Sequence, residues 1–366
     1  MEVIHHFDSG VTQPYELGDG EVTFDLRPGQ RILNVVVRDA LPQLRVHLMA
    51  DDKGEVFLTK QGLLYATDGR AFRVAPFERT GEERLSTDID TRGGRVHIAT
   101  RYPYGRDALD RLIVQCANEP QVSVRLLEES GRTVPVFDLI PRGTRGLDHY
   151  IIAGEDVWET AGCWTADWMV RLLLTDPELA ARVLNSGAIH IVPLASPYSA
   201  TLPSASYTTP EGKGIYGAAT WGDEEPPPEY ALLRDEVEAC IKAGALGLML
   251  TMHSWQGSRA FSEMGTIRES GENRLDDSRA AWAESTMEGL TRDVPLGRFR
   301  MSEKIWHPGL ARDRLLGVHD AVTFRIEITT VGQGTSELEA TARGLLEGLG
   351  AVESWEKVLP CQSNAG

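Results

Sequence analysis

Short runs in which apolar and polar positions alternate fill the first hundred residues. Gly, Asp and Pro residues separate the runs, which cover residues 21–26, 31–39, 44–50, 55–60, 71–77 and 94–100. Alternation with a period of two is typical of strands that bury one face, and short strands at this spacing favour an antiparallel β-sandwich. The pattern therefore predicts a sandwich domain over residues 1–100.

Beyond about residue 104 the pattern changes to helices that alternate with apolar strands. The expected helices cover 107–117, 160–174, 176–185, 228–244, 278–292 and 335–350. The expected strands cover 122–129, 134–140, 147–154, 188–196, 245–254 and 321–330. This alternation indicates an α/β domain over residues 101–366, with a largely parallel, mixed sheet flanked by helices.

Composition and charge narrow the class of protein. The chain has 366 residues, of which 42% are hydrophobic and 25% are charged, and this is ordinary for a globular protein of about two domains. The formal net charge of −17 argues against nucleic acid or an anionic membrane as the main partner. No apolar run reaches the roughly 18 residues of a membrane span, and the first residues do not resemble a signal peptide. Four cysteines without a CxxC pair fit a reducing compartment, so we expect a cytoplasmic protein.

Three polar residues lie where apolar strands end, which is where open α/β sheets bind ligands. Asp156 and Glu159 follow the strand 147–154, and His253 lies near the end of the strand 245–254. Two carboxylates and one imidazole could hold Zn²⁺ and leave one position open for water. In the alternative interpretation, Asp156 caps the next helix, Glu159 lies in its first turn, and His253 is a satisfied core histidine.

A glutamate and an arginine share one face of the last apolar strand. Glu327 stands two residues after Arg325, so both side chains leave the strand on the same side. A buried acid needs a partner or a role. The two residues are therefore either a structural ion pair or a general base beside an anion-binding arginine.

The order of these features resembles the zinc metallocarboxypeptidases, and the whole chain resembles their cytosolic carboxypeptidase branch, in which a β-sandwich precedes the peptidase domain. The matching segments, in chain order, are Tyr102-Pro103-Tyr104 before the first helix, Asp156 and Glu159 at the first metal motif, Pro193 and Pro197, Pro228-Glu229, His253-Ser254, and Glu327. The resemblance covers roughly residues 100–350 and, less specifically, the sandwich. It implies zinc as the cofactor, Asp156, Glu159 and His253 as its ligands, and Glu327 as the general base.

Substrate contacts follow partly from the same resemblance. Relatives carry an active-site tyrosine in the long loop before the last strand, and His307 lies in that region here. The long polar stretch 196–228 is typical of functional loops and contains Tyr216, whose phenol could reach the site. The candidate substrate-binding residues are Arg325, Ser254, Trp255, Tyr216 and His307.

Three departures from the family pattern change the expected chemistry. The first metal-binding histidine of the family is Asp156 here, and its added negative charge should make a bound metal a weaker Lewis acid. The Asn-Arg pair that grips the terminal carboxylate of a substrate is best matched by Ala218-Ala219, and neither alanine can bind an anion through its side chain. The arginine before the metal-binding glutamate is Trp158. Arg325 stands where the family usually has a small residue, and it could replace the missing positive charge.

These observations predict a zinc-dependent, atypical carboxypeptidase-like hydrolase. It would cleave an amide bond in a peptide-like or specialised small substrate, and Arg325 would suit an anionic group on that substrate. Two alternatives remain: a catalytically inactive, carboxypeptidase-like binding protein, and a non-hydrolytic metal-dependent enzyme of a biosynthetic pathway. The sequence does not indicate an oligomeric state.

Overall fold

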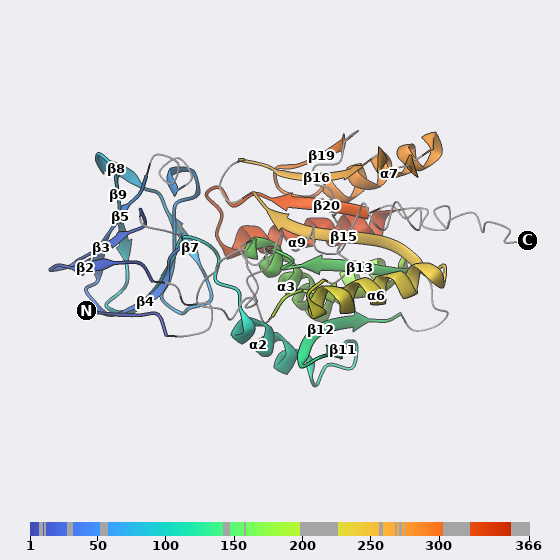
Figure 1. The fold of residues 1–366 in the computed structure, drawn as a ribbon, viewed down its shortest axis with the longest axis horizontal. Coiled ribbons are helices and arrows are strands. Elements are labelled where there is room, and N and C mark those ends of the chain that lie inside the picture. The colour runs from blue at the N-terminus through green and yellow to red at the C-terminus, as the bar shows by residue number, and fades with distance from the viewer. Residues whose placement is uncertain are drawn as a thin grey trace, which may run out of the picture.

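A β-sandwich is followed along the chain by a larger α/β region (Figure 1). The computed structural model describes residues 1–6, 10, 12–27, 32–51, 58–141, 147–156, 159–197, 226–255, 259–267, 269–270, 273–274, 276–302 and 323–352. None of the helices in this part of the chain combines the length and the apolar character that a bilayer crossing requires.

Two five-stranded sheets form the sandwich. One sheet has the order β1-β4-β10-β6-β7, and the other has the order β2-β3-β5-β9-β8. Their strands are β1 (Glu2–Ile4), β2 (Tyr15–Leu17), β3 (Glu21–Asp25), β4 (Asn34–Ala40), β5 (Gln43–Met49), β6 (Leu63–Ala66), β7 (Arg73–Ala75), β8 (Glu78–Gly81), β9 (Arg84–Asp90) and β10 (Gly94–Ala99). The inward side chains of both sheets share one apolar core, as the alternating pattern predicts.

The structure corrects two sequence-based expectations for the sandwich. The run 55–60 was expected to be a strand, but residues 58–61 are helical, and 52–57 lie outside the described residues. This helical turn places the buried amide of Gln61 2.6 Å from the carbonyl of Thr100, to which it donates. Pairing is antiparallel except between β3 and β5, which run parallel because the chain passes through the other sheet between them.

One eight-stranded mixed sheet organises the α/β region, in the order β11-β12-β14-β13-β15-β20-β16-β19. Its strands are β11 (Ser123–Glu129), β12 (Arg132–Leu139), β13 (Leu147–Ala153), β14 (Gly187–Val192), β15 (Leu246–Ser254), β16 (Ser262–Ile267), β19 (Gly297–Ser302) and β20 (Thr323–Ile328), and the short strands β17 (Glu269–Ser270) and β18 (Asn273–Arg274) form a separate pair. The central strands β14, β13, β15 and β20 run parallel, whereas β12 and β16 pair antiparallel with β14 and β20. The predicted mixed sheet is confirmed.

Helices cover both faces of this sheet (Figure 1). They are α2 (Arg106–Cys116), α3 (Thr160–Thr175), α4 (Pro177–Leu184), α6 (Pro228–Lys242), α7 (Asp277–Thr291) and α9 (Thr335–Ala351). Helix α6 packs on one face through an apolar cluster with β12, β13, β14 and β15. The other helices share a second cluster with the opposite face and with parts of the sandwich. Side chains therefore alternate between these two layers along each central strand.

The parallel register brings the ends of three strands to one edge of the sheet. Ala153, the last residue of β13, pairs with Met252 of β15. The next residue, His253, pairs with Glu327 of β20. Polar residues that lie far apart in the sequence therefore meet at this edge, as the sequence analysis expected.

Candidate metal centre

Asp156, Glu159 and His253 meet at the carboxyl edge of the sheet. Each offers one potential ligand atom, and these atoms all lie within 4.8 Å of one another. Asp156 and His253 are buried, and the Glu159 side chain is 14% exposed. The structure thus brings together the three residues that the sequence predicts as metal ligands.

One nitrogen of His253 faces both carboxylates. Its Nδ1 atom lies 2.6 Å from Glu159 Oε2 and 3.2 Å from Asp156 Oδ2. The backbone N–H of Ser254 donates to the same Glu159 oxygen over 3.2 Å, which helps to orient that carboxylate. The three side chains therefore present one nitrogen and two oxygen donors to a common point, a set that suits a divalent cation.

Local backbone geometry explains how the carboxylates reach this point. Gly154 has a φ of +71° and turns the chain out of β13, and a Cβ atom there would lie 2.9 Å from the Leu194 backbone. Gly162, in the first turn of α3, lies so close to β15 that a Cβ atom would approach the Met252 carbonyl to 2.5 Å. This close approach carries Glu159, which directly precedes α3, to His253.

Helix capping does not account for the two acids. Glu159 itself is the N-cap residue of α3, and its side chain makes no capping hydrogen bond. Asp156 lies outside the helix, and its Oδ2 atom faces His253 instead. Asp156 is therefore not the N-cap residue, and Glu159 precedes the first turn, so these two parts of the alternative interpretation are wrong. His253 has a carboxylate partner on each ring nitrogen and still fits the third part, a satisfied core histidine.

Glu155 is a fourth acid at the centre, and the sequence analysis did not identify it. Its Oε2 atom lies 3.0 Å from His253 Nε2, on the side of the ring opposite Asp156 and Glu159. Its side chain is 1% exposed. The signal that could have revealed it is its place directly after Gly154, at the end of an apolar strand. If the strand continued, Glu155 and Asp156 would point to opposite faces of the sheet. The turn at Gly154 allows both side chains to face His253.

Glu327 and Arg325 form an ion pair on the neighbouring strand. Arg325 Nη2 lies 2.5 Å from Glu327 Oε1, and the two side chains are 15% and 10% exposed. The register partners of Arg325 are Gly265 on β16 and Thr251 on β15, so its neighbour on β16 has no side chain. The geometry matches the structural ion pair of the sequence analysis, and the anchoring of a substrate by Arg325 stays a prediction.

Electrostatics at the centre favour added positive charge. Burial and the nearby Glu159 carboxylate raise the pKa of Glu327 to about 7, although Arg325 opposes this. Burial and Arg325 act to lower the pKa of His253, but Glu159 and the other two acids outweigh them and raise it well above its ordinary value. Four carboxylates thus surround one arginine and one imidazole, and a divalent cation would relieve their repulsion.

The remaining predicted site residues divide into two groups. Ser254 and Trp255 lie at the end of β15, and the N–H of Trp255 donates to the carbonyl of Ile328 over 3.0 Å. The Arg259 guanidinium stacks 4.0 Å from the centre of the Trp255 ring. The other group lies outside the described residues and comprises Tyr216, His307, Trp158 and Ala218-Ala219.

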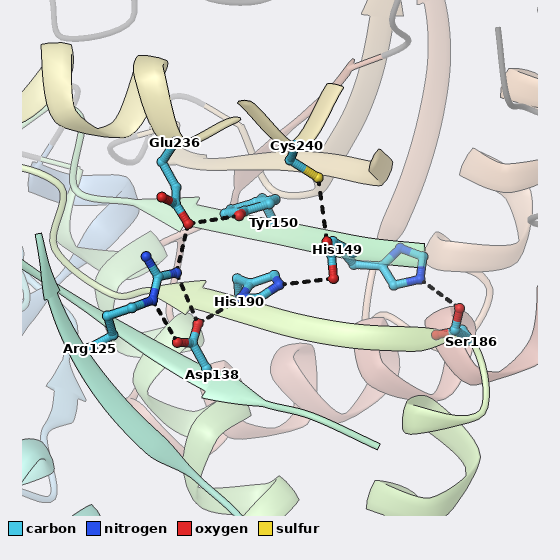
Figure 2. Close-up of polar contacts among 9 residues, drawn as sticks. Arg125, Asp138, His149, Tyr150, Ser186, His190, Glu236 and Cys240 are labelled. Carbon is cyan, nitrogen blue, oxygen red and sulfur yellow. Dashed lines mark hydrogen bonds and ion pairs between the residues drawn. The ribbon is translucent and has the colours of Figure 1, made fainter. Parts of the chain in front are cut away.

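A second, partly buried charged cluster lies beneath α6, and the sequence analysis did not identify it (Figure 2). Arg125 donates to Asp138 over 3.0 Å and to Glu236 over 2.7 Å. His190 lies 2.6 Å from Asp138 through Nδ1 and 3.4 Å from Asp148 through Nε2. We call this set, together with Tyr150 and Cys240, the α6 network.

Comparison with family models finds no match, and comparison with curated proteins finds none either. Solved structures do match. A metallo-carboxypeptidase from Burkholderia cenocepacia is 14% identical with a TM-score of 0.78, and the match covers 96% of this chain and 98% of that chain. A metallo-carboxypeptidase from Pseudomonas aeruginosa, in complex with (2-guanidinoethylmercapto)succinic acid, is 17% identical with the same TM-score and the same coverage. Because these matches span both the sandwich and the α/β region, the whole chain has the fold of metallocarboxypeptidases.

Proposed function

We propose that this protein is a metal-dependent amide hydrolase with an atypical carboxypeptidase-like site. The observation that carries the proposal is the convergence of Asp156, Glu159 and His253 within 4.8 Å at the carboxyl edge of the sheet. The metallocarboxypeptidase fold supports it, because both the sandwich and the α/β region match enzymes of that description. The assignment to the cytosolic branch and to the cytoplasm stays a prediction from the sequence.

The donor set fits a divalent cation, and we propose zinc. His253 would bind through Nδ1, and Asp156 and Glu159 would each bind through one carboxylate oxygen. Zinc accepts nitrogen and oxygen ligands in catalytic sites and commonly has three protein ligands. When bound, it polarises a carbonyl group and makes a water molecule more acidic.

Glu327 is the proposed general base. Its ionised carboxylate takes a proton from the attacking water and then gives that proton to the leaving amide nitrogen, so the carboxylate is regenerated after each turnover. Glu327 is buried and is the register partner of His253, so it lies beside the three proposed ligands. Arg325 would keep the carboxylate oriented between these steps, because the two groups lie 2.5 Å apart.

We propose a peptide-like or specialised small substrate rather than an ordinary polypeptide C-terminus. Alanines stand at 218 and 219, where the resemblance places the carboxylate-binding pair. An anionic group on the substrate could contact Arg325, but only if that arginine shares its donors with Glu327. Ser254, Trp255, Tyr216 and His307 remain the other candidate contacts.

One observation favours a second candidate function, that of a binding protein without turnover. The ion pair between Arg325 and Glu327 ties up the proposed base and lowers its tendency to accept a proton. In that case the fold would bind a ligand at the same edge of the sheet and release it unchanged.

Metal content tests the two candidates. We expect the protein purified without chelator to contain close to one zinc per chain, or to bind zinc when it is added. Less than about one tenth of an equivalent before and after zinc addition would contradict the hydrolase. If metal is bound, hydrolysis of a panel of N-acylated dipeptides, with the Glu327→Gln variant as the control, separates an enzyme from a binding protein.

A further inference from the structure

We infer that Glu155 is a positioning residue that determines which nitrogen of His253 binds the metal and how strongly it binds. This inference rests on the metal centre proposed above. It adds a fourth acid to that centre, one that touches neither the metal nor the substrate and acts through the imidazole.

The two ring nitrogens of His253 face two different sets of carboxylates. Nδ1 faces Asp156 and Glu159, whereas Nε2 lies 3.0 Å from Glu155. A metal held by Asp156 and Glu159 can reach only Nδ1, so Nε2 carries the proton and donates a hydrogen bond to Glu155. Glu155 thus selects the tautomer that leaves the Nδ1 lone pair free.

Glu155 is buried, and its side chain is directed at His253. Its side chain is 1% exposed, and its second oxygen, Oε1, is buried without a hydrogen-bond partner among the described residues. Removing a carboxylate from water is costly unless hydrogen bonds compensate. The His253 N–H is the hydrogen-bond donor that the described structure offers to this carboxylate.

The backbone around Glu155 is fixed independently of the metal. Its carbonyl accepts a 2.6 Å hydrogen bond from the hydroxyl of Tyr230, a fully buried residue of α6. Gly154 supplies the turn that precedes it. Glu155 therefore approaches His253 from the side of α6, while Glu159 approaches from α3, and the imidazole is held between the two.

Glu155 should strengthen metal binding because the proposed centre has a single nitrogen ligand. A carboxylate that accepts the second N–H of a ligating imidazole orients the ring and makes the free nitrogen a stronger donor. Here His253 is the one histidine among the three proposed ligands, so its donor strength matters most. Loss of such a partner typically weakens metal affinity about 10-fold to 100-fold.

Zinc affinity measured by competition with a chromogenic chelator tests this inference without any substrate. We expect Glu155→Leu to weaken zinc binding about 10-fold to 100-fold, and Glu155→Gln, which keeps an acceptor oxygen, to weaken it less. Glu236→Gln is the matched control, because it removes a carboxylate that lies on α6 and contacts Tyr150 of β13 but belongs to the α6 network. The control should bind zinc as the wild type does.

Each outcome has one meaning. Equal affinity of the wild type and both Glu155 variants, together with loss of binding in Asp156→Ala, would overturn the inference and leave the metal centre intact. Absence of zinc binding in the wild type would overturn the metal centre and the inference with it. If Glu155→Leu does not fold, the isosteric Glu155→Gln decides, through its zinc dissociation rate and the absorption spectrum of its cobalt form. A purely structural role would change the melting temperature of the metal-free protein and leave both of these quantities unchanged.

Discussion

Two charged clusters lie along the same sheet, one buried and one partly exposed, and they differ in where their carboxylates point. In the α6 network, Asp138 and Glu236 each accept hydrogen bonds from Arg125, and a second donor completes each of them (Figure 2). In the metal centre, Asp156 and Glu159 point at one nitrogen of a single imidazole. The first arrangement satisfies its charges within the protein, whereas the second gathers lone pairs around one point.

The protonation of the two clusters shows the same difference. Burial acts to raise the pKa of Asp138, but hydrogen bonds from His190 and Arg125 outweigh it and hold the pKa below its ordinary value. At the centre, burial and Glu159 raise the pKa of Glu327 to about 7 despite its arginine. The neighbours of Asp138 therefore stabilise its charged form, whereas those of Glu327 do not offset its burial.

The largest expected effect is on turnover. Glu327→Gln removes the proposed base, so we expect kcat to fall about 10²-fold to 10⁴-fold while zinc remains bound. Steady-state kinetics and metal analysis on the same preparation measure both quantities. Full activity in this variant would remove Glu327 from the mechanism.

Zinc should stabilise the folded protein through the centre alone. At a free zinc concentration 100 times the dissociation constant, we expect about 2.7 kcal/mol of added stability in the wild type. His253→Ala should lose this increment, whereas Arg125→Met should keep it. Thermal unfolding with and without zinc measures the difference, and an equal increment in His253→Ala would place the metal elsewhere.

Disrupting the α6 network should lower the free energy of unfolding without changing the affinity for zinc. Arg125→Met leaves Asp138 and Glu236 without their shared cation, and we expect the free energy of unfolding to fall by about 1.5–3 kcal/mol. The Arg125 side chain is 37% exposed, so solvent screening places the effect toward the lower value. Urea unfolding measures it, and a change in zinc affinity would show that the two clusters are coupled.

A smaller effect on the free energy of unfolding should appear at low pH. Because the pKa of Asp138 is lower in the folded state than the unfolded value of about 3.9, its contribution to stability is present above pH 4 and is lost as the pH falls through the folded value. Asp138→Asn should therefore differ from the wild type in unfolding free energy at pH 6 and converge with it below pH 4. A difference that is constant with pH would assign the effect to packing.

The sequence predicts most of the fold because hydrophobic periodicity reports which face of an element is buried. It correctly separates the alternating strands of the sandwich from the longer apolar strands of the α/β region. It fails at 58–61, because a single helical turn that serves one glutamine contact has no period to detect. The parallel pairing of β3 with β5 also escapes prediction, since it depends on how the two sheets are threaded.

The two clusters also differ in how far they could be predicted from the sequence. Asp156, Glu159 and His253 could be brought together from the sequence because each lies at or just after the end of a strand, and these ends must lie at the carboxyl edge. The members of the α6 network lie within elements, and Arg125 and Glu236 are 111 positions apart. No local pattern connects two such residues. Glu155 escaped for a third reason, since its direction depends on the positive φ of Gly154.

Gly162 sets how closely α3 approaches the sheet beside the candidate metal centre. Because α3 meets the carbonyl of Met252 through bare backbone at this position, the first turn of the helix is held against the strand that carries His253, and Glu159 directly precedes that turn. A side chain at position 162 would have to move α3 away from β15, because its Cβ atom alone would approach the Met252 carbonyl to 2.5 Å. Such a variant should therefore separate Glu159 from His253 and weaken any binding that needs both residues.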